Sequence, residues 1–334
     1  MKIVVLMGGD SSEREVSLVS GDQVAKALTE NGHEVIKIDP AATKAEQTEL
    51  NQTDKHWIGI EYPDTAILPL HRGSLYTKNI LIIKRLKVDA VFNALHGGKG
   101  ENGIVQGMLD ACEIPYSGSG RIASMIAMEK DMTKFFFESN QLPVPDGIVF
   151  TKNSKITDIP DNLGYPLIVK PNDQGSTIGL HVVEKESDLR SAIEDAFKFG
   201  SKLIIEEYIP GREITVAILG DRALSIVEIK PKHSLYDYEC KYTGGMSSYE
   251  APADIEPTLT NHIQEISLKA HHVLGCRGYS RVDLRLTEKG KPYLLEVNTN
   301  PGMTGTSLVP KSAKAENINF NDLLEQIIKN ARCD

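Results

Sequence analysis

What the sequence lacks narrows its function before any motif is considered. Its four cysteines form no CxxC pair and no dense framework, a pattern typical of reduced thiols rather than disulfides. No apolar run approaches the roughly 20 residues of a membrane span. The short N-terminal run MKIVVLM ends in Gly-Gly-Asp and does not have the form of a signal peptide. We therefore expect a cytoplasmic protein without membrane association.

An excess of positive charge is also missing. The chain has 37 Lys and Arg against 46 Asp and Glu, which gives a net charge of −9. This balance argues against binding to nucleic acid or to an anionic membrane surface. An anionic ligand must then be held by local lysines, arginines or backbone amides. The length of 334 residues suggests two or three domains.

Two common nucleotide-binding motifs are absent as well. The N-terminal MGGDSS does not complete the GxGxxG dinucleotide pattern, and no loop carries the GK[ST] of a Walker motif. The strand, Gly-Gly turn and helix at the start suggest a Rossmann-type dehydrogenase. The incomplete glycine pattern makes that interpretation unfavourable.

Strand and helix patterns divide the chain into three regions. KIVVLM and VDAVFNAL are strand-like runs that alternate with helical runs, which predicts a parallel sheet with ligand loops at its carboxyl edge. The pattern changes near residue 120 and again near LIIEEYIPGREITV. We predict an N-terminal parallel α/β domain (1–118), a small central domain with a glycine-rich hairpin flap (119–205), and a larger C-terminal domain with an antiparallel sheet (206–334).

The glycine-rich hairpin is the first candidate site. Residues 175–179, Gly-Ser-Thr-Ile-Gly, lie between two strand-like runs, where backbone N–H groups can approach phosphate oxygens closely. Lys170, on an otherwise apolar strand, would add a positive charge beside this flap. Taken alone, the pattern is equally that of a plain glycine hairpin with an edge lysine.

The ends of two strands form the second candidate site. Arg281, Asp283 and Arg285 share one face of the run YSRVDLRL, and Glu296 and Asn298 share one face of PYLLEVN. If these strands pair antiparallel, two carboxylates and an amide could bind one or two Mg²⁺ ions that carry nucleotide phosphates. Arg281 could neutralise charge that develops on a substrate oxygen. Alternatively, these charged residues form only a row on a solvent-exposed face of the strand.

The run IIEEYIPGREITV is typical of a hinge between domains. Glu206 and the backbone around Tyr208 and Ile209 could contact an adenine edge, and Glu213 could accept hydrogen bonds from ribose hydroxyls. A solvated hairpin explains this run equally well.

Taken in order, these stretches resemble the D-alanine–D-alanine ligases of the ATP-grasp superfamily over nearly the whole chain. The matching stretches are GGDSSEREVSLVSG, HGGKGENGIVQGMLD, PYSGSG, VKPNDQGSTIG, GREITVAILG, YDYECKY, GYSRVDLRL and LLEVNTNPGMTGTSLVP. The resemblance implies an α/β (α+β) ATP-grasp fold and an enzyme that joins two D-alanines for peptidoglycan precursors. It also implies ATP as co-substrate, a D-alanyl phosphate intermediate, two Mg²⁺ or Mn²⁺ ions, and a homodimer.

The resemblance also implies roles for individual residues around the two D-alanines. Glu13, Ser176 and Tyr242 match the family's substrate triad, and His96 matches a histidine near the first D-alanine. Glu13 would hold the first ammonium, while Ser176 and Tyr242 would join the flap (173–179) to a lid (231–250). The oxyanion and the second carboxylate would be held by Arg281, the backbone N–H of Gly302, Ser307 and Leu308.

For the nucleotide and the metal, the resemblance implies two further sets of residues. The ATP contacts would be Lys130, Lys170, Glu206, Tyr208, Ile209, Glu213, Lys241 and Leu295. The metal ligands would be Asp283, Glu296 and Asn298.

A few positions depart from the commonest family pattern. Asn102 stands where an aspartate is usual, Asn300 where a small or apolar residue is usual, and Gly305-Thr306 where Ser-His is frequent. The last two departures lie beside the acceptor pocket. Tyr242 matches the dipeptide-forming members, which favours D-alanine over a hydroxy acid as acceptor.

Two other functions remain open on the sequence. The chain could be an ATP-grasp ligase that joins a different amino-acid or hydroxy-acid pair. It could also be a non-catalytic nucleotide-binding relative, but that reading predicts the loss of a metal ligand, the oxyanion arginine or a phosphate lysine. None of these residues is missing.

Overall fold

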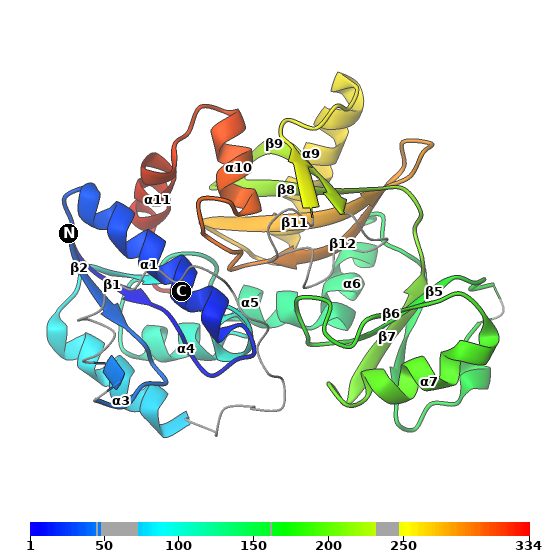
Figure 1. Ribbon diagram of the computed structural model, residues 1–334, viewed down its shortest axis with the longest axis horizontal. Coiled ribbons are helices and arrows are strands. Elements are labelled where there is room, and N and C mark those ends of the chain that lie inside the picture. The colour runs from blue at the N-terminus through cyan, green and yellow to red at the C-terminus, as the bar shows by residue number, and fades with distance from the viewer. Residues whose placement is uncertain (45, 48–72, 161, 232–246) are drawn as a thin grey trace.

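The computed structural model describes residues 1–44, 46–47, 73–160, 162–231 and 247–334. Figure 1 shows these residues gathered around three separate β-sheets, each covered by helices. The N-terminal sheet is blue and cyan, the central sheet green, and the third sheet yellow-green to orange. Within the described residues, no helix is long and apolar enough to cross a bilayer.

The N-terminal sheet is parallel, with strand order β2-β1-β3. The run KIVVL forms the middle strand, and its last four residues are buried because helices cover both faces of the sheet. The elements are β1 (Lys2–Leu6), α1 (Arg14–Glu30), β2 (Glu34–Ile38), α3 (Gly73–Leu86), β3 (Ala90–Asn93), η1 (Gly98–Gly100) and α4 (Ile104–Ala111). The loops that follow β1 and β3 therefore leave the sheet at the same edge.

The central sheet is antiparallel, with order β4-β7-β5-β6. Strands β5 and β6 are joined by the glycine-rich run, so the predicted hairpin flap is confirmed as an element of the fold. The elements of this region are α5 (Arg121–Met128), α6 (Lys130–Ser139), β4 (Gly147–Thr151), η2 (Ile156–Asp158), β5 (Leu167–Pro171), β6 (His181–Val183), α7 (Glu186–Ala196) and β7 (Lys202–Glu207).

The third sheet is also antiparallel, with order β10-β9-β8-β11-β12. Its helix α9 buries Ile263, Ile266 and Ala270 against the apolar face of the sheet. The elements are β8 (Arg212–Leu219), β9 (Arg222–Pro231), β10 (Ser247–Glu250), α9 (Pro257–Val273), β11 (Tyr279–Leu286), β12 (Pro292–Asn298), α10 (Leu308–Ala315) and α11 (Phe320–Lys329).

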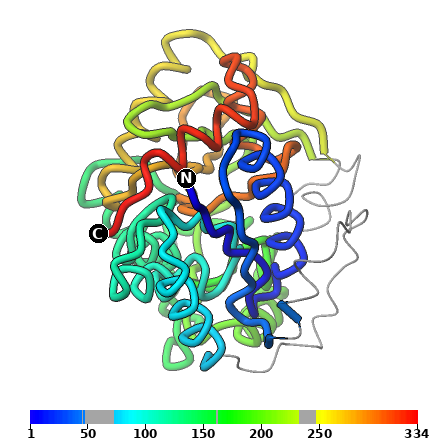
Figure 2. Tube along the Cα trace, turned by 90° about the vertical axis from the view of Figure 1, so that its left-hand side faces the viewer, coloured from blue at the N-terminus to red at the C-terminus, as the bar shows by residue number. Residues whose placement is uncertain are grey.

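The C-terminal helix returns to the N-terminal sheet. Figure 2 shows the red end of the chain beside the blue start, and α11 shares one apolar core with α1 and β3. Asn31 Nδ2 donates to the Asn321 carbonyl at 3.0 Å, and Tyr116 and Arg332 form an isolated antiparallel bridge. This packing fixes the loops that follow β3 and β12 against each other.

A buried histidine joins α9 to the third sheet and makes the stability of this region depend on pH. His271 is 1% exposed, and its Nδ1 lies 2.7 Å from Ser280 Oγ on β11. Burial, aided by the neighbouring His272, lowers the pKa of His271 to about 4. The folded state therefore disfavours the imidazolium form.

We predict that this region loses stability as the pH falls from the unfolded histidine pKa of about 6.5 towards 4. In that window the unfolded chain binds the proton and the folded chain does not, which costs up to about 3 kcal/mol. Unfolding midpoints of the native chain and His271→Gln, measured against pH, test this. The native midpoint should fall more steeply below pH 6.5, and parallel curves would contradict the assignment.

Candidate active site

Two adjoining cavities lie between the sheets. The larger cavity has a volume of about 230 Å³ and the smaller about 140 Å³. Gly175, Ser176, Arg281 and Glu296 line both, so the two cavities adjoin at these residues. Within the described residues, every residue predicted for the site lines at least one of them.

The residues predicted for the amino-acid substrates gather in the larger cavity. Its lining includes Glu13, His96, Ser176, Arg281, Glu296, Asn298, Gly302, Ser307 and Leu308. The smaller cavity gathers the described residues predicted for ATP and two of the predicted metal ligands, Asp283 and Glu296. Its lining includes Lys130, Lys170, Glu206, Tyr208, Ile209, Glu213, Asp283 and Leu295. Lys241 and Tyr242 lie outside the described residues.

The flap closes onto the loop that precedes α1. Ser176 Oγ donates to Glu13 Oε1 at 2.5 Å, which joins the central region to the N-terminal one. Ser176 and Thr177 have φ values of 50° and 60°, in the left-handed region that residues with side chains rarely occupy. Strained conformations of this kind are commonest at functional sites.

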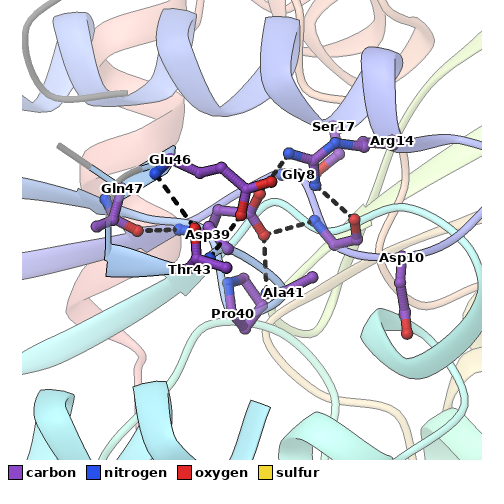
Figure 3. Close-up of polar contacts among 12 residues, drawn as sticks. Gly8, Asp10, Arg14, Ser17, Asp39, Pro40, Ala41, Thr43, Glu46 and Gln47 are labelled. Atoms are coloured by element: carbon purple, nitrogen blue, oxygen red, sulfur yellow. Dashed lines mark hydrogen bonds and ion pairs between the residues drawn. The ribbon is translucent and has the colours of Figure 1, made fainter. Parts of the chain in front are cut away.

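A buried carboxylate holds the Gly8–Gly9 turn from which the Glu13 loop starts (Figure 3). Asp39, 2% exposed, accepts from Gly9 N at 3.1 Å and from Arg14 Nη2 at 2.6 Å. Arg14 also donates to the Gly9 carbonyl. Gly8 has a φ of +85°, and a Cβ there would lie 2.7 Å from Asp39 Oδ2, so only glycine fits this turn.

Glu101 is a carboxylate of the larger cavity that was not among the predicted site residues. Its Oε1 lies 3.7 Å from His96 Nδ1. Burial raises the pKa of Glu101, and the nearby charge of Glu13 adds to this shift while His96 opposes it. The run HGGKGENG contained this residue, but sequence spacing alone could not direct it towards Glu13.

Two lysines neutralise a buried carboxylate in the smaller cavity. Glu206, 5% exposed, lies 2.5 Å from Lys170 Nζ and 3.2 Å from Lys134 Nζ. Burial alone would raise the pKa of Glu206, but the two lysines outweigh it and hold the pKa below its usual value. Lys134 was missed in the sequence, although it follows Lys130 by four residues and therefore shares its helix face.

A buried asparagine holds the helix start that carries Lys130. Asn172, 1% exposed, donates through Nδ2 to Glu129 Oε2 at 2.5 Å and to Asp131 Oδ1 at 2.8 Å. Its main-chain carbonyl accepts from Lys130 N at 3.1 Å. Lys130 Nζ in turn donates to the flap carbonyl of Gln174 at 2.7 Å. Asn172 therefore fixes this lysine relative to the flap.

The predicted metal ligands lie on paired strands, as the sequence suggested. β11 pairs antiparallel with β12, and Asp283 faces Glu296. The next pair is Leu284 with Leu294, so Leu295 is an extra residue that forms a β-bulge. The bulge breaks the alternation of the strand and turns both Leu295 and Glu296 towards the smaller cavity.

These donors suit a hard divalent cation. Asp283 is held by both nitrogens of the Arg281 fork, at 2.8 and 2.6 Å, and by Thr215 Oγ1 at 2.6 Å. Glu296 lies 3.5 Å from Lys130 Nζ. Among the residues described, no three His, Cys, Asp or Glu side chains are grouped for a metal. Two carboxylates and the Asn298 amide fit Mg²⁺, which takes few protein ligands and keeps water and phosphate oxygens.

The start of helix α10 forms part of the wall of the larger cavity. Ser307 is the N-cap of α10, but its Oγ accepts from Thr304 N at 3.0 Å instead of capping the helix. The first turn of α10 therefore has no cap from Ser307, and its backbone N–H groups favour an anion such as a carboxylate. Gly302 lies beside Ser307, where a Cβ would come within 3.2 Å of Ser307 Oγ.

The glycine-rich flap on one antiparallel sheet, facing carboxylate-bearing strands of another across a shared cavity, defines the ATP-grasp class of enzymes. Two family models match the chain: "D-ala D-ala ligase N-terminus" over residues 2–119 and "D-ala D-ala ligase C-terminus" over residues 136–329. The chain therefore belongs to the D-alanine–D-alanine ligase family.

Individual relatives agree with this assignment. The D-alanine–D-alanine ligase of Nitrosomonas europaea is 41% identical over 98% of this chain and 96% of its own. That of Aquifex aeolicus is 41% identical over 98% of this chain and 100% of its own. A crystal structure of the Bacillus anthracis D-alanine–D-alanine ligase complexed with ATP has a TM-score of 0.78 and 33% identity, covering 98% of this chain and 96% of that one.

We predict that Ser176→Ala loosens the flap, because it removes the hydroxyl that bonds Glu13. Loss of one hydrogen bond to a charged group should speed amide hydrogen exchange at residues 175–179 by about tenfold. Ser187→Ala, which removes an exposed hydroxyl on α7, is the matched control. Equal exchange rates in the flap of both variants would show that the Ser176 contact does not hold it.

Proposed function

We propose that the chain joins two D-alanines to D-alanyl-D-alanine through a D-alanyl phosphate, releasing ADP and phosphate, for peptidoglycan precursor synthesis. The observation that carries this proposal is that Arg281 and Glu296 line both cavities. A nucleotide in one cavity and an amino acid in the other would meet at these residues. Family membership over nearly the whole chain supports the same reaction.

ATP would occupy the smaller cavity. Glu206, Tyr208, Ile209, Glu213 and Leu295 would surround its adenosine. Lys130 and Lys170 would face its phosphates, with Lys241 as a third lysine. These local cations would let a chain of net charge −9 bind a polyanion.

Asp283, Glu296 and Asn298 would hold Mg²⁺ or Mn²⁺, with two ions as the expected number. When bound, the ions would spread the negative charge of the phosphates. Arg281, which pairs with Asp283 in this structure, could then turn towards the substrate.

In the first step, a carboxylate oxygen of the first D-alanine forms a bond to the γ-phosphorus of ATP, and the bond to the ADP oxygen breaks. Glu13 would hold the ammonium of this D-alanine, with His96 beside it. Lys130 and Lys170 would stabilise the charge on the transferred group. The product is a D-alanyl phosphate.

In the second step, the neutral amine of the second D-alanine attacks the acyl carbon. Arg281 and the backbone N–H of Gly302 would stabilise the tetrahedral oxyanion. The carbon–oxygen bond to phosphate then breaks, and the amine nitrogen gives up a proton to the departing phosphate as the peptide bond forms. Ser307, Leu308 and the start of α10 would hold the second carboxylate.

The acyl phosphate has to be protected from water. The flap, held shut by Ser176 and Glu13, would close one side of the cavity. Tyr242 and most of the proposed lid (231–250) lie outside the described residues. We also propose the domain limits 1–118, 119–205 and 206–334, a homodimer, and a cytoplasmic location, where ATP is available.

We predict that Glu296→Gln nearly abolishes turnover while the fold persists, because one metal carboxylate is replaced by a neutral amide. A loss of at least about a hundredfold is expected for a metal ligand. The measurement is ATP- and Mg²⁺-dependent phosphate release with D-alanine, with the dipeptide identified by mass. Glu288→Gln, in the exposed turn between β11 and β12, is the matched control.

Different substrates in the same assay separate the alternatives. No turnover with D-alanine, together with turnover of another amino-acid or hydroxy-acid pair, would assign the enzyme to a different pathway. Tight ATP binding without turnover of any pair would indicate a non-catalytic relative. Near-normal turnover of Glu296→Gln at saturating Mg²⁺ would remove Glu296 from the metal site.

We predict that Asn172→Ala weakens the use of ATP. It removes the buried amide that joins Glu129 to Asp131 on both sides of Lys130, two carboxylates that Lys202 Nζ also contacts. Loss of these buried hydrogen bonds, at 1–3 kcal/mol, should raise the KM for ATP by about tenfold and leave the D-alanine constants nearly unchanged. Asn153→Ala, exposed in the same region, is the control. Equal ATP constants would show that Lys130 is held by other contacts.

A further inference from the structure

Asn300 lies at the junction between the N-terminal sheet and the third sheet, and all its polar groups are engaged. The residue is 4% exposed. Its side-chain Nδ2 donates to the Leu95 carbonyl, and its Oδ1 accepts from Tyr279 Oη at 2.8 Å. Its main-chain N donates to Asn298 Oδ1 at 3.2 Å, and its carbonyl lies 3.2 Å from His96 Nδ1.

These partners come from three separate parts of the chain. Leu95 and His96 follow β3, Tyr279 begins β11, and Asn298 ends β12. Only one residue, Thr299, separates Asn298 from Asn300. Asn300 therefore connects the side of the larger cavity that contains His96 with the strand end that contains Asn298.

The carboxamide is suited to this junction because it donates and accepts at once. The Leu95 carbonyl can only accept, and it needs a donor. Tyr279 is 1% exposed, and its ring stacks on Phe92 of β3 with centroids 6.4 Å apart. An aliphatic side chain at position 300 would remove the donor from Leu95 and the acceptor from Tyr279, which is costly where water is excluded.

The same junction fixes the orientation of the His96 ring. Because the Asn300 carbonyl only accepts, Nδ1 of His96 carries the hydrogen of this contact. In the neutral ring, Nε2 is then the acceptor, and it lies 2.9 Å from Ser20 Oγ on α1. The ring is thus held from both sides.

We propose that Asn300 is a positioning residue: its carboxamide holds the Leu95–His96 segment against the loop that follows β12. This sets the place of the first D-alanine relative to Arg281 and the Gly302 N–H. The inference rests on the proposed function of the site. Asn300 itself lines neither cavity, but its partners His96 and Asn298 line the larger cavity and not the smaller one, so the effect should concern D-alanine more than ATP.

The test is Asn300→Leu, which keeps the branched arrangement of side-chain heavy atoms but can neither donate nor accept. Dependence of the rate on D-alanine, resolved into two Michaelis constants, is measured together with the KM for ATP. We expect the Michaelis constant for the first D-alanine to rise by about tenfold. This rise corresponds to a loss of about 1.4 kcal/mol, the size expected for lost buried hydrogen bonds. The ATP constant should change by less than about threefold.

Amide hydrogen exchange provides a readout that does not depend on turnover. Exchange at Leu95, His96 and Gly97 should be about tenfold faster in Asn300→Leu. Tyr279→Phe removes only the donor to Asn300 Oδ1 and should give a smaller change in the same direction. It also keeps the proposal testable if Asn300→Leu does not fold.

Ser280→Ala is the matched control. It lies on β11 next to Tyr279 but on the opposite face, and it loses a buried contact to His271. It should lower the unfolding midpoint without changing the first D-alanine constant. If Asn300→Leu or Tyr279→Phe behaves in the same way, Asn300 is only structural and the proposal is wrong. A wild-type chain that makes no dipeptide from D-alanine would instead overturn the proposed function, before any variant is compared.

Discussion

The antiparallel pairing of β11 with β12, with Leu295 as one extra residue, is the constraint on which the site depends. Strict alternation would direct Leu295 and Glu296 to opposite faces of the sheet. The bulge lets an apolar side chain and a carboxylate face the smaller cavity side by side. One irregular residue therefore places the apolar wall of the proposed nucleotide site next to the carboxylate proposed to bind its metal.

Charged side chains of the two cavities are already paired with other side chains of the site. Arg281 holds Asp283, Lys170 and Lys134 hold Glu206, and Ser176 donates to Glu13. Buried charges without partners would be very costly, so these pairs stabilise the site before any ligand arrives. A ligand must exchange partners with them rather than meet bare charges. An acidic chain can hold an anionic ligand under these conditions because its cations are local and pre-positioned.

The sequence predicted what depends on local periodicity and could not predict what depends on contacts between distant segments. Alternation along two strands correctly placed Asp283 opposite Glu296. The bulge was not predicted, because Leu295 and Glu296 look like ordinary alternation in sequence. Asn172 and Asn300 were missed as supports because their partners lie 41 to 43 and 205 residues away in the chain. Lys134 could have been found, since it follows Lys130 at helical spacing.

The packing of the chain also limits which part of the site can move. Met303 and Val309 flank the segment 304–308, which lines part of the larger cavity. Both share one core with α1 and α11, so this segment is anchored at both ends. The hydrophobic cores of the described residues include no flap residue, and Ser176 and Thr177 occupy a strained conformation. Opening the cavity through the flap breaks polar contacts, among them the hydrogen bonds from Ser176 to Glu13 and from Lys130 to Gln174, whereas moving the segment 304–308 disrupts an apolar core. Among the described residues, the flap is therefore the part of the cavity wall that can move with the smaller loss of buried apolar contacts.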